Sequence, residues 1–77
     1  MVAKLVGMRS VDFVAEDGRR VSGFSLYLGT RNENVIGYQV DRVFVSADKV
    51  DSKVLKVDTE INVDFNSKGR VVAVSAI

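Results

Sequence analysis

Residues 60–77, EINVDFNSKGRVVAVSAI, decide the fold, because they hold two alternating segments joined by a short turn. Ile61, Val63 and Phe65 alternate with polar residues, which is typical of a half-buried β-strand. The turn is NSKG, in which Gly69 adopts a positive φ at little cost. The segment after it is apolar in both phases, which predicts one face on the core and the other on a partner subunit. These residues therefore predict a β-hairpin.

The same alternation occupies most of the preceding chain, and valine, whose β-branch favours strands, supplies most of its apolar residues. Residues 2–14 predict a long first strand. Gly7 lies in its middle, where a bulge or a sharp coil could exchange the phase that faces the core. The Asp17-Gly18 turn leads into a second strand at residues 20–29. Residues 35–45 predict a third strand, interrupted at Asp41-Arg42.

Residues 46–56, SADKVDSKVLK, form the one segment that does not alternate. Ala47, Val50 and Val54 recur at helical spacing and Ser46 can cap a helix, so we expect a short helix or an irregular crossover. Five strands in this order predict an all-β fold, a small five-stranded barrel like the oligonucleotide/oligosaccharide-binding (OB) barrel. An SH3-like barrel is the alternative. The long first strand and the break after the third favour the OB-like barrel.

Composition limits the possible functions. A chain of 77 residues has room for one domain, residues 1–77, and it contains neither cysteine nor histidine. Disulfides, zinc sites and the usual nucleophile–base pairs are therefore excluded, and the carboxylates fall on turns or polar strand faces. We expect no metal, no cofactor and no enzyme activity. Because no segment resembles a signal peptide or a membrane span, we expect a cytoplasmic protein without a membrane partner.

Aromatic residues fall into two groups. Phe13, Phe24 and Phe65 lie on the predicted core phases, and we expect them to be buried. Tyr27 lies on the phase opposite Phe24, and Tyr38 lies where the chain returns from a polar loop. An outward tyrosine is a stacking platform for a nucleic-acid base. The alternative is a ring that covers a sheet edge with its hydroxyl in water.

Arginines interleave with these tyrosines, and the guanidinium group suits both phosphate contact and stacking on bases. In an OB-like barrel the second and third strands form the usual binding face. Lys68 and Arg70 belong first to the C-terminal turn and could add phosphate contacts. The predicted nucleic-acid-binding residues are Arg9, Arg20, Tyr27, Arg31, Tyr38, Arg42, Lys68 and Arg70. The alternative is a solvated face with scattered arginines, and the formal net charge of +1 counts against a nucleic-acid partner.

The segments VDF at 11–13, GRRVSG at 18–23, LYL at 26–28 and VDFNSKGRVVAV at 63–74 carry a resemblance over nearly the whole chain. The chain resembles short proteins from the replication modules of Gram-positive plasmids, phages and mobile elements. It is also similar in size and strand order to the dimeric single-stranded DNA-binding proteins of filamentous phages. That resemblance implies a homodimer that coats single strands without sequence preference, with the tyrosines and arginines as contacts.

Two functions remain open from the sequence. The first is a non-catalytic protein that binds single-stranded DNA or RNA as a homodimer. The second is a protein–protein interaction or assembly module without nucleic-acid binding, which the two-sided apolar character of the last strand favours.

Overall fold

The computed structural model describes residues 1–77 and contains a single five-stranded antiparallel sheet. Its strands are β1 (Val2–Val14), β2 (Arg20–Arg31), β3 (Tyr38–Ser46), β4 (Glu60–Phe65) and β5 (Val71–Ala76). Two 3-10 turns, η1 (Ala47–Lys49) and η2 (Ser52–Val54), connect β3 to β4. The all-β class predicted from the alternation is confirmed. No helix is long and apolar enough to cross a membrane.

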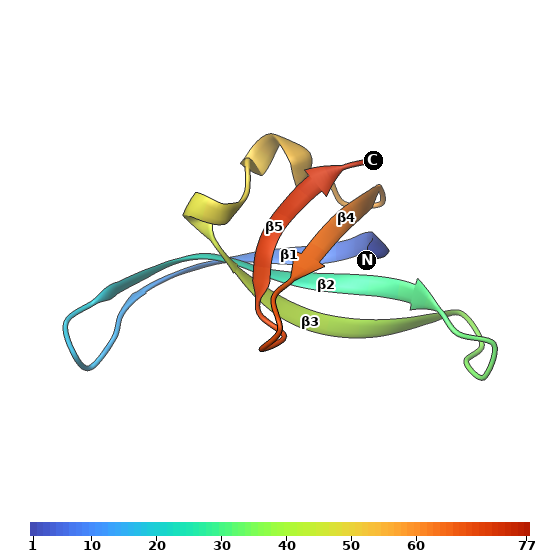
Figure 1. Cartoon of the computed structure of the whole chain (residues 1–77), viewed down its shortest axis with the longest axis horizontal. Helices are drawn as coiled ribbons and strands as arrows, with labels where there is room; N and C mark the ends of the chain where they lie inside the picture. Colours follow the sequence, from blue (N-terminus) through green and yellow to red (C-terminus); the bar gives the residue numbers. More distant parts are fainter.

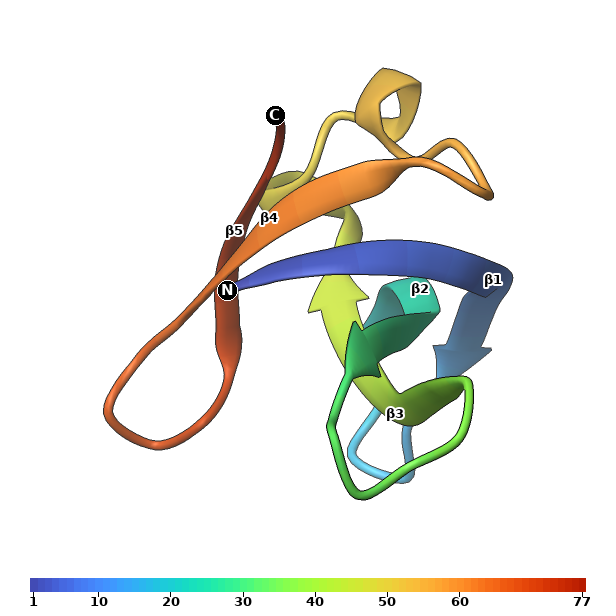
Figure 2. The same ribbon diagram turned by 90° about the vertical axis from the view of Figure 1, so that its right-hand side faces the viewer.

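The strand order in the sheet is β3-β2-β1-β4-β5, so that β3 and β5 are its two edges. No hydrogen-bonded ladder joins these edges, and the sheet is not closed. Figure 1 shows β4 and β5 lying across the long β1–β2–β3 part, and Figure 2 shows β1 and β4 side by side. The β1–β2 hairpin extends beyond the rest of the molecule as an arm (Figure 1).

A bulge near Gly7 divides β1, as the sequence predicts. Leu5 pairs with Leu28, but Gly7 rather than Val6 pairs with Tyr27, so one residue of β1 has no partner. Because side chains alternate between faces, this extra residue exchanges the inward and outward phases. Leu5 is buried before the bulge, and Met8 packs against the core after it.

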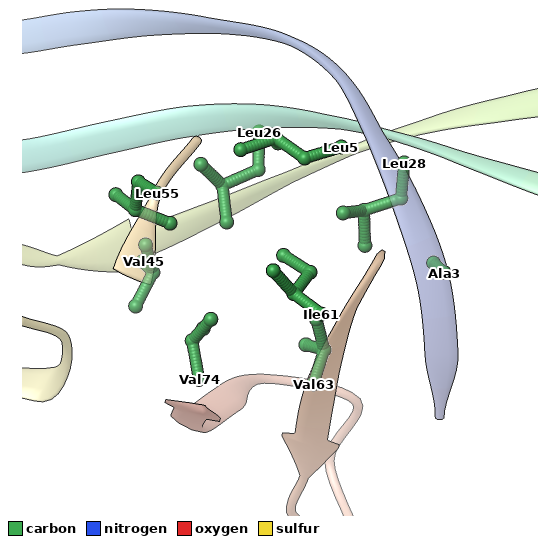
Figure 3. Packing of buried hydrophobic residues seen from close by; sticks show 9 residues of the cluster. All are labelled: Ala3, Leu5, Leu26, Leu28, Val45, Leu55, Ile61, Val63 and Val74. Atoms are coloured by element: carbon green, nitrogen blue, oxygen red, sulfur yellow. The ribbon is translucent and has the colours of Figure 1, made fainter. Parts of the chain in front are cut away.

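The core lies between β1–β2–β3 and the β4–β5 hairpin. Figure 3 shows side chains from both layers pointing into the same space. Each large aliphatic side chain there contributes roughly 1.5–3 kcal/mol through loss of contact with water. The buried residues are Ala3, Leu5, Leu26, Leu28, Val45, Leu55, Ile61, Val63 and Val74.

Both glycine turns form as predicted. Gly18 and Gly69 have φ values of 86° and 78°, which a side chain would disfavour. In the second turn the Asn66 side chain accepts backbone hydrogen bonds from Lys68 at 2.9 Å and Arg70 at 3.0 Å. This side chain holds the turn that joins β4 to β5.

The connection between β3 and β4 contains two 3-10 turns instead of an α-helix. Val50 and Val54 pack against the core as their spacing predicts. The expected Ser46 cap is wrong, because its side chain makes no capping hydrogen bond. Asp51 caps the second turn instead, accepting a bond from the Lys53 backbone N–H at 3.0 Å.

The predicted break in the third strand is also wrong. Asp41 and Arg42 pair with Leu28 and Tyr27 inside a continuous β3 that begins at Tyr38. On an edge strand, charged side chains reach water without interrupting the ladder.

Two of the three phenylalanines expected in the core are exposed. Phe13 is 53% exposed because the bulge near Gly7 puts it on the outward phase of β1. It also lies in the arm, which β4 does not reach, since β4 pairs with β1 only at residues 2–4. Phe65 is 37% exposed at the end of β4, beyond an irregularity in its pairing with β5. Phe24 is half-buried against the core. The local alternation placed these residues correctly in strands but did not say what covers each strand.

Candidate nucleic-acid interface

The face of β1–β2–β3 that points away from the core gathers basic and aromatic residues. Directly paired residues of an antiparallel sheet place their side chains on the same face. Leu26 and Leu28 point into the core, so Tyr27 and the residues paired in its phase point outward. We call this surface the outer face. Its basic and aromatic members are Lys4, Arg9, Phe13, Tyr27, Arg31, Tyr38, Arg42 and Phe44.

Residues that pair directly across β1, β2 and β3 form rows that run perpendicular to the strands, and the members of the outer face lie in several such rows. Arg31 pairs with Tyr38 in the first row, and Tyr27 pairs with Arg42 two rows further along. Ser25 pairs with both Arg9 and Phe44 in the next row. Rows on one face lie about 6.5–7 Å apart, two residues along a strand. Basic and aromatic groups therefore alternate over a continuous strip of sheet.

The outer face is positively charged although the whole chain is nearly neutral. Within β1–β2–β3 no aspartate or glutamate occupies a paired position on this face, and the one paired carboxylate beside it is Glu60 of β4, opposite Lys4. The protein has two ion pairs, Asp17 with Arg19 and Asp12 with Arg20, and both lie in or beside the β1–β2 arm. The three arginines of the outer face, Arg9, Arg31 and Arg42, thus have no ion-pair partner, whereas Lys4 has a carboxylate beside it.

Three rings on this face lie across glycines of a neighbouring strand. A Cβ at Gly7 would stand 3.6 Å from Cδ2 of Tyr27, and one at Gly29 would stand 3.2 Å from Cδ1 of Tyr38. A Cβ at Gly23 would lie 2.8 Å from Cζ of Phe44. Because glycine has no side chain, each ring can lie close to the backbone of the neighbouring strand. Such rings can present an aromatic surface to a ligand.

Tyr38 already has a cationic partner. The Cζ atom of Arg31 lies 4.3 Å from the centre of the Tyr38 ring, and Nζ of Lys4 lies 5.4 Å from it. These are cation–π distances. Arg31 also donates a hydrogen bond to the Gly37 carbonyl at 3.3 Å. A base approaching Tyr38 would therefore stack on the guanidinium group or displace it.

Two hollows adjoin at Arg42 and Phe44. One, of about 480 Å³, opens among β1, β2 and β3 and includes Phe13. The other, of about 690 Å³, occupies the seam between the edges β3 and β5. Lys49 and Arg70 join Arg42 in lining the seam, and no carboxylate lines it. A chain of phosphates crossing from the outer face into the seam would meet basic groups throughout.

The structure brings together most of the sequence-predicted site residues. Arg9, Tyr27, Arg31, Tyr38 and Arg42 share the outer face. Arg70 lies near Arg42 in the seam, whereas Lys68 is exposed in the β4–β5 turn and does not line either hollow.

Arg20 does not join this group. Its phase on β2 is that of Leu26 and Leu28, opposite to Tyr27. Its guanidinium group donates two hydrogen bonds to the Asp12 carboxylate, at 3.0 and 2.7 Å. These bonds lower the pKa of the Asp12 carboxyl and raise that of Arg20. Arg20 therefore links β2 to β1 within the arm, on the face opposite to the outer face.

The structure adds three residues that the sequence did not single out, Lys4, Phe44 and Lys49. Lys4 and Arg9 have opposite parity in β1, and only the bulge places both on the outer face. Phe44 lies between two valines, so its phase was ambiguous from the alternation. Lys49 enters the seam from a 3-10 turn. Among these placements, only that of Lys4 depended on a feature with a sequence signal, namely the bulge marked by Gly7.

Comparison of the chain with protein-family models, curated proteins and solved structures gives no match.

Proposed function

We propose that this protein binds single-stranded nucleic acid, DNA or RNA, on the outer face without catalysing a reaction. One observation carries the proposal: the outer face combines Lys4, Arg9, Arg31 and Arg42 with four aromatic side chains and no carboxylate. Guanidinium and ammonium groups attract the phosphate backbone, and aromatic rings stack on bases of any sequence. Binding would accordingly be indifferent to sequence.

The strand order supports an OB-like arrangement for this binding sheet. Joining the edges β3 and β5 of the order β3-β2-β1-β4-β5 would complete a small barrel. The seam between these edges holds Arg42, Lys49 and Arg70, so a bound strand can reach the β4–β5 turn. The resemblance to replication proteins of mobile elements further suggests a cytoplasmic role in coating single strands during replication.

Titration of fluorescent oligo-dT at several salt concentrations tests the proposal. Each phosphate neutralised on a single strand contributes about −0.7 to the slope of log K against log salt concentration. Contact of all four basic residues of the outer face with phosphate would give a slope of about −3 per protomer. Absence of binding at low salt would refute the proposal. Duplex DNA of the same length serves as the control, and we expect it to bind more weakly because its bases are not available for stacking.

Self-assembly is a second candidate function, favoured by the character of β5. This edge strand exposes Val72, and Ile77 beyond its end is 71% exposed. An exposed apolar edge is a surface on which another strand can pair. A homodimer formed there would leave the outer face free for nucleic acid but would cover the β5 side of the seam. Sedimentation equilibrium tests this assembly, and a strict monomer at micromolar to millimolar concentration would argue against it.

A further inference from the structure

The hollow on the outer face is more apolar than a phosphate-binding surface requires. Phe13 of β1 and Phe44 of β3, which are 53% and 41% exposed, both line it, and Val11 and Val21 contribute to its lining. Ser25 and Arg42 are the polar residues among its lining. Exposed rings beside half-buried valines are typical of a binding site for an apolar or aromatic group.

Charge decides which occupant fits. Arg42 lines the hollow, Arg9 shares a cross-strand row with Phe44 through Ser25, and the outer face carries no carboxylate. In a two-fold dimer through this face the same patch would meet itself, which would oppose arginine to arginine. A ligand that is both aromatic and anionic would place its ring against the apolar lining and its negative charge near the arginines. A nucleotide has this chemistry.

We propose that the hollow holds one base of the bound single strand, stacked on the ring of Phe44, with the neighbouring phosphate on Arg42. The inference rests on the proposed function and assigns a position within it. Phe44 is better placed than Tyr38, whose ring already has the guanidinium group of Arg31 over it. It is also more open than Tyr27, which is half-buried.

The Phe44→Leu variant tests this assignment when two ligands are compared. Oligo-dT carries bases, whereas an abasic oligonucleotide of equal length carries only the sugar–phosphate chain. Stacking on one aromatic residue contributes roughly 5- to 150-fold in affinity per base. We expect Phe44→Leu to weaken oligo-dT binding within this range and to leave the abasic oligonucleotide nearly unaffected. Phe65→Leu is the matched control, since Phe65 is similarly exposed but lies on β4 outside the outer face.

An unchanged preference for oligo-dT over the abasic ligand in Phe44→Leu would overturn the assignment and leave the proposed function standing. Failure of the wild-type protein to bind either ligand would overturn both. Circular dichroism of each variant verifies that the sheet has formed, and a Phe44→Tyr variant, which keeps the ring, should retain the preference.

Phe44→Trp provides a measurement that does not depend on removing the ring. The chain has no tryptophan, so the new residue would be the only one and would report on position 44, where the two hollows adjoin. We expect oligo-dT to quench its fluorescence and the abasic oligonucleotide to quench it far less. A fluorescence change that follows protein concentration without any oligonucleotide would show that a second copy fills the hollow, which would overturn the proposal.

Discussion

Replacing Arg42 by glutamine should lower single-strand affinity in a manner that depends on salt. Arg42 lies on the outer face beside Tyr27, lines both hollows and has no ion-pair partner. Its removal should therefore eliminate one phosphate contact and change the slope of log K against log salt by about 0.7. Measured from a common value at 1 M, that change amounts to roughly 8-fold weaker binding at 50 mM salt and roughly 3-fold at 200 mM.

Arg20→Gln is the matched control for this experiment. It alters net charge by the same amount, but Arg20 is held by Asp12 on the opposite face. Fluorescence anisotropy with oligo-dT at five salt concentrations gives the slope for each variant. The reasoning predicts a reduced slope for Arg42→Gln and a wild-type slope for Arg20→Gln. Equal changes in both variants would show that net charge, and not the outer face, governs binding.

Three further predictions concern stability. Gly23→Ala should lower the free energy of unfolding in urea by about 1–3 kcal/mol or more, because the added Cβ would overlap a β3 carbonyl oxygen. Gly7→Ala should cost less, because its Cβ would lie 3.6 Å from Tyr27, an ordinary contact distance. Equal losses of stability in the two variants would contradict this explanation. The lowered pKa of Asp12 means that its ion pair stabilises the fold above the unfolded-state pKa, near 3.8, and that this contribution is lost as pH falls through the folded-state pKa. The difference in urea midpoint between wild type and Arg20→Gln should therefore vanish in acid, and a difference that persists at pH 2 would exclude this linkage. Asn66→Ala removes two hydrogen bonds from the β4–β5 turn and should destabilise the protein by about 1–2 kcal/mol, whereas an unchanged midpoint would mean that the backbone alone holds the turn.

The local features of the fold were predictable because their causes are local. Alternating apolar residues identify strands, and positive-φ glycines identify turns, so the turns at Gly18 and Gly69 were correctly expected. Of the two features that Gly7 allowed, a bulge or a sharp coil, the structure has the bulge. The sequence predicts that Arg20, Tyr27, Arg31, Tyr38 and Arg42 converge on one surface. Strand phase places four of these residues on the outer face, together with Arg9, but places Arg20 on the opposite face.

Other parts of the site depended on contacts between distant segments. Phe13 is exposed because it follows the bulge on the outward phase of β1, in an arm that β4 does not reach. No local pattern reports how far the pairing of β4 with β1 extends. Arg20 lies on the opposite face because of its phase in β2, and its guanidinium group is hydrogen-bonded to Asp12 of β1. The seam with Arg42 and Arg70 exists because β3 and β5, more than twenty residues apart in sequence, face each other as unpaired edges.

By itself, the sequence determined where strands, turns and the phase exchange lie, because backbone propensity and side-chain alternation act over neighbouring residues. Tertiary structure alone decided which face of each strand meets the core and which side chains stay in water. That choice depends on the layer packed opposite, and it turns a nearly neutral chain into one with an outer face free of carboxylates.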